Sequence, residues 1–193
     1  MKLINLIKEL ITEKKNDTYE YGCAMLYFYF PEINKIQDAI NPNDVYEEEG
    51  DRTYGFEDEP HTTLLFGLHQ EVTPDEIKDV LDQFTFGPCI ISNASLFENE
   101  KYDVLKFDVS GDNLHDVNSA LKKFPHTNSF PNYHPHLTIG YLKPGTGKRY
   151  VKMLKGYKYE LQPQYAVYSS PDGTKTKIKI NKQVILPIGT YIY

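Results

Sequence analysis

The feature of the sequence that most constrains its fold is a strand–helix–loop–strand unit that occurs twice. The first copy runs from a predicted strand at 20–30 through a helix at 32–40 to the motif Pro60-His61-x-Thr63-Leu64. The second copy runs from a strand at 102–109 through a helix at 113–124 to Pro135-His136-x-Thr138-Ile139. A glycine follows each motif closely, Gly67 in the first copy and Gly140 in the second. If a pseudo-twofold axis relates the two copies, the motifs converge on one point.

The spacing within each motif places its histidine and threonine on one face of a strand, because residues i and i+2 point to the same side. His61 therefore projects with Thr63, and His136 projects with Thr138. The imidazole pKa of about 6.5 lets one neutral and one protonated histidine coexist at neutral pH, as base and acid. Threonine hydroxyls can donate to phosphate oxygens, where negative charge develops. We therefore predict that these residues are catalytic and that the reaction needs no metal and no cofactor.

Periodicity and capping signals predict the remaining elements. An amphipathic helix is expected at 2–14, and a second helix begins at the capping box Thr73-Pro74-Asp75-Glu76 and extends to about Phe84. Asp112 is expected to cap the helix at 113–124. Another strand is predicted at 89–97, and the chain alternates in β fashion near 157–168, 176–180 and 183–193. No linker or low-complexity tract interrupts it, so residues 1–193 are predicted to form a single domain.

Composition narrows the class of partner. The chain has 193 residues, 40% of them hydrophobic, and a net charge of −6. A protein that grips long DNA or RNA normally needs a basic face, so long nucleic acid is not expected as a partner. No apolar run is long enough to span a membrane, and the N-terminus is too polar for a signal peptide. The two cysteines, Cys23 and Cys89, have no metal-type spacing and are interpreted as buried thiols of a cytoplasmic protein.

The paired His-x-Thr-hydrophobic motifs resemble those of the two-histidine (2H) phosphoesterases, and the resemblance covers roughly residues 18–190. It implies an α/β (α+β) fold: a bilobal, duplicated unit in which two antiparallel sheets flank a central cleft, with helices outside. The stretches YGCAMLYFYF, PHTTLLFGLH, SLFENEKYDVLKF and YHPHLTIGY look closest to the phage branch of that family. This branch includes anti-CBASS nucleases, which destroy the cyclic oligonucleotides of bacterial antiphage immunity. The resemblance also assigns catalysis to His61, Thr63, His136 and Thr138, and a phage protein of this kind would act in the host cytoplasm.

Aromatic side chains near the motifs are candidates for contacts with a nucleobase. Strand 20–30 carries a purely apolar side and a second side with Tyr21, Cys23, Met25, Tyr27 and Tyr29. The hydroxyls on the second side fit the lining of a cavity, and stacking on aromatic rings is the usual way to hold a splayed base. We expect substrate contacts from Tyr21, Tyr27 and Tyr29, from Tyr141 on the second motif strand, and from His134 at the rim of the site.

Two other motifs are given structural interpretations. The segment Pro144-Gly145-Thr146-Gly147-Lys148-Arg149 lacks the first glycine and the final Ser/Thr of a phosphate-binding P-loop, so it is read as a turn. The acidic loop 43–60 lacks a calcium-loop pattern and is read as a solvated loop rather than a metal site.

Three functions remain open at the level of sequence. The first is a metal-independent phosphodiesterase that cleaves 3′–5′ bonds of cyclic di- or oligonucleotides, with the ribose 2′-OH as nucleophile. The second is a 2′,3′-cyclic phosphodiesterase that acts on RNA ends with water as nucleophile. The third is a cyclic-nucleotide sponge, a binding protein that does not cleave its ligand. The matched histidine and threonine pairs favour an enzyme, because binding alone needs no acid/base pair.

Overall fold

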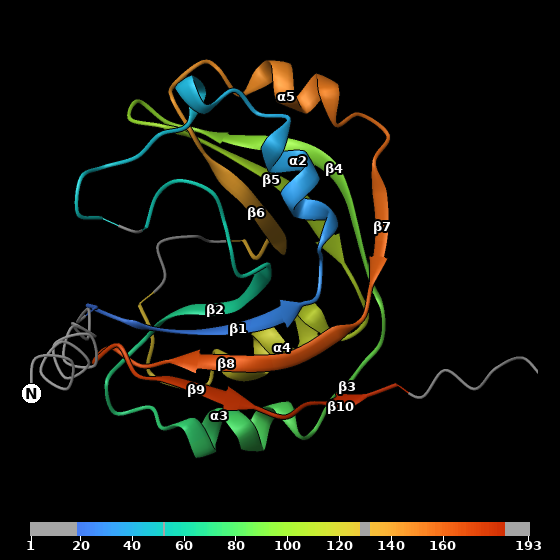
Figure 1. Cartoon of the computed structure of the whole chain (residues 1–193). Coiled ribbons are helices and arrows are strands. Elements are labelled where there is room, and N and C mark those ends of the chain that lie inside the picture. The colour runs from blue at the N-terminus through green and yellow to red at the C-terminus, as the bar shows by residue number, and fades with distance from the viewer. Residues whose placement is uncertain (1–18, 52, 128–131, 184–193) are drawn as a thin grey trace, which may run out of the picture.

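Two four-stranded sheets form the frame of the molecule, and each contains one of the two motif strands. The computed structural model describes residues 19–51, 53–127 and 132–183. The helix predicted at 2–14 lies outside these residues, as does the strand predicted at 183–193 except for Gln183. Figure 1 shows one sheet in the lower half of the view and the other in the upper half. The expected α+β architecture with antiparallel sheets is confirmed.

The first sheet has the order β2-β1-β8-β9, and all its neighbouring strands are antiparallel. These strands are β1 (Gly22–Phe28), β2 (His61–Leu68), β8 (Pro163–Ser169) and β9 (Lys175–Ile178). The second sheet has the order β6-β5-β4-β7 and is also antiparallel. Its strands are β4 (Cys89–Glu98), β5 (Asp103–Ser110), β6 (His136–Leu142) and β7 (Lys158–Leu161). A short parallel pair, β3 (Thr85–Phe86) and β10 (Asn181–Lys182), completes the strands of the described residues.

Each repeat contributes a helix that packs against the motif strand of the other repeat. They are α2 (Glu32–Asp38), α3 (Pro74–Leu81), α4 (Leu114–Leu121) and α5 (Lys148–Met153), with a 3-10 turn η1 at Pro42–Asp44. Helix α2 belongs to the first repeat but contacts β6 of the second, and α4 of the second repeat contacts β2 of the first. Each spatial half therefore combines a motif strand from one repeat with a helix from the other. This exchange is not visible in the linear order of the repeats.

Several predicted elements are confirmed and others are corrected. The capping box at Thr73 and Glu76 is present at the start of α3. Asp112 is not the cap of α4, because Asn113 occupies that position in a left-handed conformation and donates its side-chain amide to the Thr85 carbonyl. The predicted strand at 157–168 is two strands, β7 and β8, in different sheets. The predicted turn at 144–149 ends in helix α5, which begins at Lys148.

Both motif strands lie at the edge of their sheet and carry a β-bulge at the same point. In β2, Met25 pairs with Thr63 and Ala24 pairs with Leu65, so Leu64 is the extra residue. In β6, the corresponding extra residue is Ile139. Burial alternates in the same way from the histidine onward, with the histidine and threonine half-buried and the residues between and after them buried. The pseudo-symmetry predicted from sequence therefore extends to a local irregularity of the backbone.

Helix side chains of the opposite repeat hold the two bulges. Asn118 of α4 donates its amide to the carbonyl of Leu64 at 2.6 Å. Gln37 of α2 donates to the carbonyl of Ile139 at 3.0 Å and to the carbonyl of Glu57 at 2.7 Å. Both amides are buried, and a buried carbonyl left without a donor is costly. The crosswise packing of the helices thus fixes the shape of both motif strands.

Loops from the opposite repeat cover the open edges of the motif strands. Thr127 donates its backbone N–H to the carbonyl of Gly67, and Tyr141 donates to the carbonyl of Gly55. A Cβ at Gly67 would lie 1.8 Å from the Thr127 carbonyl oxygen, and one at Gly140 would lie 2.8 Å from the Phe56 ring. These close approaches explain the glycine after each motif. Edge strands normally need such protection, because their unpaired N–H and C=O groups can bind another chain.

The acidic loop 43–60 covers the edge of β6, a structural role that the sequence did not predict. The side chains of Glu47, Glu49 and Asp51 are exposed, as expected for a solvated loop. Its backbone, however, runs along β6, where Tyr46 N–H bonds to the Tyr141 carbonyl and Glu57 N–H bonds to the Ile139 carbonyl. This path brings the end of the loop beside His61.

The buried apolar residues form one large cluster that joins both sheets and the helices, and a smaller one that contains Met25, Tyr27 and Val167. The smaller cluster lies on the same face of the first sheet as the motif residues. In the described part of the chain, no helix has the length and apolar character needed to cross a membrane.

Candidate active site

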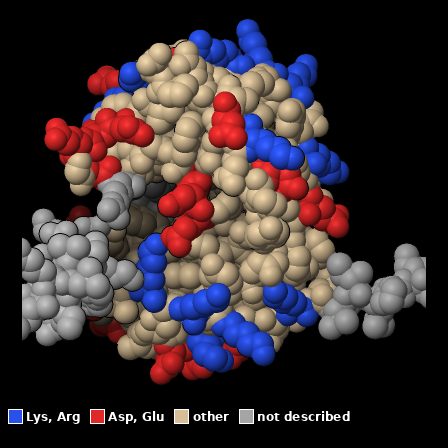
Figure 2. Space-filling view, viewed as in Figure 1, with Lys and Arg blue, Asp and Glu red and all other residues tan. Residues whose placement is uncertain are grey.

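The two motif strands, β2 and β6, contact each other where the two sheets meet. Within a pair of antiparallel strands, residues directly opposite each other share a face. His61 lies opposite Tyr27 and Thr63 lies opposite Met25. His136 lies opposite Asp108, and Thr138 lies opposite Lys106. Figure 2 shows a hollow between the two halves of the molecule, with basic side chains gathered below it.

The two histidines make equivalent contacts with the backbone. Nδ1 of His61 lies 2.8 Å from the carbonyl oxygen of Glu59, and Nδ1 of His136 lies 2.9 Å from that of His134. In both cases the carbonyl belongs to the residue two positions earlier. A carbonyl can only accept, so each Nδ1 carries a proton and donates. Nε2 is then the ring nitrogen of each histidine that is free to take up or release a proton.

The threonine hydroxyls are available for a ligand. In the described part of the chain, Oγ1 of Thr138 has no hydrogen-bond partner, and Oγ1 of Thr63 has only the Sγ of Cys23 at 4.0 Å. The backbone around Thr63 is fixed from the other half of the molecule, because the Tyr133 hydroxyl donates to the Thr63 carbonyl at 2.9 Å. Both threonines are half-buried and stand beside their histidines.

The surroundings of His136 favour its neutral form. Burial lowers the pKa of His136, and the positive charges of Lys106 and His61 lower it further. The hydrogen bond to the His134 carbonyl and the charge of Asp108 act in the opposite direction and are outweighed. The edge of the His136 ring meets Phe97, with ring centroids 4.9 Å apart. His136 is therefore suited to accept a proton.

Lys106 is a buried cation at the centre of the second sheet. The whole residue Lys106 is 5% exposed. Its ammonium donates to Ser95 Oγ at 2.8 Å and to Asp108 Oδ1 at 2.9 Å. The same ammonium lies 4.6 Å from the centroid of the Phe97 ring. A buried lysine normally needs such partners, because removing a charge from water is expensive. Its position opposite Thr138 adds positive charge on the face that carries the second motif.

The surroundings of His61 are different. Oε2 of Glu57 lies 3.6 Å from its Nδ1, so a protonated His61 forms an ion pair. The ring stacks on Tyr27, with centroids 5.3 Å apart and an interplanar angle of 24°. Burial and the nearby charges of Glu59 and Glu57 raise the pKa of Tyr27, so its hydroxyl stays protonated. A carboxylate beside one histidine and an ammonium near the other make the two halves of the site electrostatically unequal.

Cys23 is also on this face but is not a reactive thiolate. Burial raises the pKa of its thiol to about 12, outweighing the hydrogen bond with Thr63. Because the thiolate is the nucleophilic form, Cys23 is a poor candidate for a nucleophile. Within the described residues, no group of three His, Cys, Asp or Glu side chains is arranged to hold a metal ion.

The structure places the predicted substrate-contact residues at different distances from the motifs. Tyr27 stacks directly on His61. Tyr21 stacks on His69 and meets Phe66 edge-on, beyond the motif on the same strand pair. Tyr29 is 74% exposed and lines a separate pocket at the end of β1.

The bulge in β6 changes the position of Tyr141. Strict alternation would place it on the opposite face from His136, but it pairs with Val104 and so shares the face of the motif. It belongs to a cluster of tyrosine rings whose other members are Tyr46, Tyr54 and Tyr102. The side chain of His134 is exposed, and its carbonyl positions His136.

Sequence reasoning missed several residues that surround the motifs: Glu57, Phe97, Lys106 and Tyr165. The sequence did contain a signal for Lys106. It is a charged residue on the side of strand 102–109 that faces away from the apolar residues Leu105 and Phe107. The others become visible only when the pairing of the strands is known. Tyr165, for example, comes from β8 and stacks on Tyr27 with centroids 5.3 Å apart.

Comparison with known proteins identifies the fold. No protein-family model matches the chain, and no curated protein matches it. The solved structure of Kluyveromyces marxianus Usb1 with uridine monophosphate is similar over 83% of this chain and 98% of that chain, with 11% identity and a TM-score of 0.51. A crystal structure of a phosphoesterase covers 83% of this chain and 99% of its own, with 14% identity and a TM-score of 0.46. The chain thus shares the fold of Usb1, and this fold is consistent with the duplicated 2H phosphoesterase fold that the sequence resemblance implies.

Proposed function

We propose that the protein is a 2H-type phosphodiesterase that uses His61 and His136 as its acid/base pair. The observation that carries this proposal is the equivalence of the two motifs. Each histidine lies on an edge strand, donates Nδ1–H to the carbonyl two residues earlier, and has a threonine on the same face. General acid–base catalysis needs two groups held in opposite protonation states around one reacting centre. Two imidazoles with free Nε2 atoms meet this need.

The unequal surroundings assign the roles. His136 is the general base, because burial and the charge of Lys106 favour its neutral form. His61 is the general acid, because its protonated form is paired with Glu57. In the reaction, Nε2 of His136 takes the proton of the attacking hydroxyl as the new P–O bond forms. Nε2 of His61 gives its proton to the oxygen that leaves as the old P–O bond breaks.

The threonines and Lys106 stabilise the phosphate. The hydroxyls of Thr63 and Thr138 donate to the non-bridging oxygens, where negative charge increases in the transition state. Lys106 contributes a positive charge in a buried position, where electrostatic effects are stronger than in water. These contributions come from groups already in place before the substrate binds.

The substrate class we propose is a cyclic di- or oligonucleotide with 3′–5′ linkages. The sequence resemblance to phage anti-CBASS nucleases supports it and suggests a role in phage counter-defence. In such a linkage the ribose 2′-OH lies next to the phosphorus and is the nucleophile. The alternative is a 2′,3′-cyclic phosphodiesterase that acts on RNA ends. The likeness to Usb1, solved with uridine monophosphate, supports a nucleotide substrate in either case.

The test is incubation of the protein in EDTA with a panel of cyclic dinucleotides, cyclic trinucleotides and RNA ending in a 2′,3′-cyclic phosphate, with products identified by mass spectrometry. We expect cleavage of cyclic dinucleotides or trinucleotides, and loss of about 10²–10⁴-fold in rate for His61→Ala and for His136→Ala. Opening of the RNA ends alone would favour the alternative. Binding of the cyclic nucleotides without cleavage would identify a sponge, and activity that requires an added divalent ion would contradict the metal-independent mechanism.

A further inference from the structure

A groove lined by lysines lies along the outer part of the first sheet, away from the two histidines. Its larger part has a volume of about 720 Å³ and is lined by Phe28, Tyr29, Gln164, Tyr165, Lys177 and Lys179. Its smaller part, of about 450 Å³, shares Gln164 and Lys179 and adds Ile180, Asn181 and Lys182. We call the two parts together the lysine groove. Single ligand pockets commonly have volumes of about 300–1,000 Å³, so the lysine groove has room for a ligand of more than one unit.

The edge strand of the sheet presents the lysines of this groove. Along β9 and the residues that follow it, Lys177 and Lys179 are exposed. Ile178 and Ile180 are buried, as the alternation of an extended chain requires. The described residues place no carboxylate within ion-pair distance of Lys177, Lys179 or Lys182, and no residue that lines the groove is acidic. In a protein with a net charge of −6, such a groove attracts anions locally.

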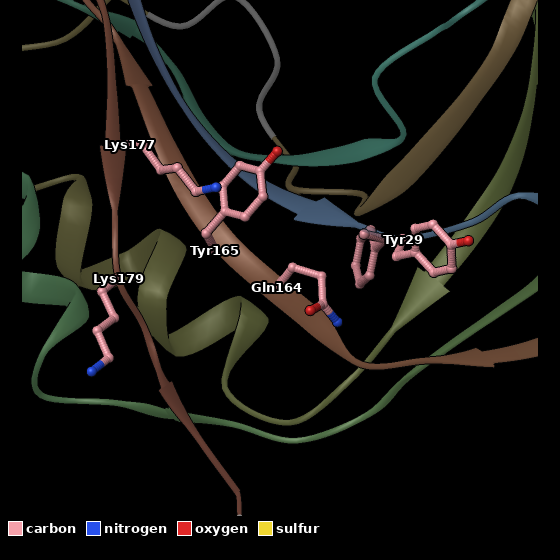
Figure 3. A pocket seen from close by; sticks show the side chains of 6 residues that line it. Tyr29, Gln164, Tyr165, Lys177 and Lys179 are labelled. Atoms are coloured by element: carbon pink, nitrogen blue, oxygen red, sulfur yellow. The ribbon is translucent and has the colours of Figure 1, made fainter.

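The lysine groove also contains an exposed aromatic ring, because Tyr29 is 74% exposed. Tyr165 is less accessible, since Tyr27 stacks on its ring and the Lys177 ammonium lies 3.6 Å from its centroid. In Figure 3 the Lys177 side chain extends onto the Tyr165 ring, whereas Tyr29 and Lys179 point away from it. Proteins hold single-stranded nucleic acids by combining a positively charged groove with aromatic rings on which bases stack. The lysine groove has both features.

The lysine groove lies apart from the candidate active site. His61, Tyr27 and Tyr165 form a stacked row across β2, β1 and β8, with ring centroids 5.3 Å apart at each step. Lys177 comes after this row, on β9. Strands in a sheet are about 4.8 Å apart, so β9 lies roughly 14 Å from β2. Two neighbouring phosphates of a nucleotide chain cannot span that length. A cyclic dinucleotide with one phosphate between the histidines therefore cannot reach Lys177, and only a longer strand can.

We propose that the lysine groove is a second binding site, which holds a short segment of single-stranded nucleic acid. Lys177 and Lys179 bind its phosphates, and Tyr29 stacks on one of its bases. A duplex is not the ligand, because its bases are already paired and stacked on one another and cannot lie on Tyr29. This inference goes beyond the proposed function, because binding in the groove requires neither histidine.

The test is fluorescence anisotropy with the wild-type protein and a labelled strand of 2′-O-methyl uridine, about eight nucleotides long, which lacks the 2′-OH that would attack its own phosphate. We expect binding that weakens as the salt concentration rises. In Lys177→Gln/Lys179→Gln the slope of log Kd against log salt should decrease by about 1.4, because each phosphate contact with a single strand contributes roughly 0.7. Tyr29→Ala should raise Kd about fivefold or more without changing the slope, because one base loses its stacking surface.

Matched controls come from exposed residues outside the groove. Lys152→Gln/Lys155→Gln removes two exposed lysines in and after α5, and Tyr157→Ala removes a ring that is 44% exposed. Both variants should bind the strand as the wild type does.

A strand of the same length and charge without bases separates this proposal from a site for any polyanion. Equal binding of that strand, absence of binding, or unchanged binding in Lys177→Gln/Lys179→Gln would overturn the proposal. The affinity for a cyclic dinucleotide should not change in this double variant, and a loss of affinity would show that the groove belongs to the active site. Because the labelled strand is bound and not cleaved, a failure of the catalytic proposal leaves this measurement unaffected.

Discussion

At the scale of single residues, the two histidines have the same backbone contact but different neighbours. A carboxylate lies 3.6 Å from His61, while His136 is beside an aromatic ring and near a buried ammonium. A symmetric pair of sites would give both imidazoles the same preference for a proton. The lowered pKa of His136 favours its neutral form, which suits the base of the proposed acid/base pair.

Lys106 should control the pH at which the base becomes available. Since His136 must be neutral to act, kcat/KM falls as the pH drops through the pKa of His136, which lies below its ordinary value. Lys106→Met removes a positive charge that disfavours protonated His136, so this pKa rises and the acidic limb of the profile moves to higher pH. Lys106→Arg keeps the charge and should leave the limb in place. A pH–rate profile of kcat/KM measures both; a limb that does not move in Lys106→Met would contradict the assignment of His136 as base.

The threonines offer a controlled test of phosphate binding. Thr63→Val and Thr138→Val keep the shape of the strand and remove one donor, so kcat should fall by roughly 10²-fold in each. The control is Thr62→Val, because Thr62 is fully buried on the opposite face and its hydroxyl has no hydrogen-bond partner among the described residues. That variant should retain wild-type turnover and stability. Steady-state kinetics measures the effect. A wild-type kcat in Thr63→Val and Thr138→Val would show that these hydroxyls do not stabilise the transition state.

At the scale of elements, the sequence predicts what depends on local pattern. The strands β1 and β5 and the capping box of α3 follow from patterns over a few residues, and all three elements are confirmed. The alternation does not predict burial, because side chains on both sides of these two strands are mostly buried. The repeated His-x-Thr motif carries its own geometry, because the side chains of i and i+2 share a face of any strand. Prediction of the four candidate catalytic residues therefore did not require knowledge of the sheet order.

Features that depend on contacts between distant segments were not predictable in this way. The carbonyls of Leu64 and Ile139, at the two bulges, accept hydrogen bonds from Asn118 and Gln37 of the opposite repeat. The path of loop 43–60 is set by the unpaired edge of β6. Lys106 and Tyr165 become neighbours of the motifs only through strand register. Alternation alone would even have placed Tyr141 on the wrong face.

The amides that hold the bulges should couple stability to activity. Asn118→Leu removes the side-chain donor to the Leu64 carbonyl. Gln37→Met removes the side-chain donor to the Glu57 carbonyl and one of the two donors to the Ile139 carbonyl, which keeps the Glu57 N–H. Each variant should therefore lower the free energy of unfolding by about 1–3 kcal/mol. Since the bulge positions the motif strand, kcat should also fall, on the order of tenfold or more, under conditions where the protein remains folded. Asn34→Leu, at an exposed position of α2, is the control and should change stability by no more than about 0.5 kcal/mol. Chemical denaturation and steady-state assays measure the two effects, and unchanged values in both variants would show that the bulges do not need these amides.

At the scale of the whole molecule, the exchange of helices and loops between repeats ties the two motifs into one unit. Each motif strand is packed by a helix of the other repeat and covered by a loop of the other repeat. Each half of the candidate site therefore contains residues of both repeats. The overall negative charge is compatible with an anionic substrate because cations are concentrated locally, at Lys106 in one sheet and at Lys177 on the other.

The choice between a 2′-OH and water as nucleophile concerns this whole arrangement, because the same acid/base pair can activate either. In a 3′–5′ linkage the 2′-OH is already adjacent to the phosphorus, which gives it a large advantage in effective molarity over free water. A cyclic dinucleotide with 2′-deoxyribose at the scissile position should therefore bind with similar affinity but be cleaved at least about 10³-fold more slowly than the ribose form. The first product from the ribose form should carry a 2′,3′-cyclic phosphate. Parallel assays of the two compounds, with products identified by mass spectrometry and affinities measured in the inactive double variant, give the answer. Equal turnover would exclude attack by the 2′-OH and favour water; a ribose substrate that yields no cyclic phosphate, even at short times, would point in the same direction.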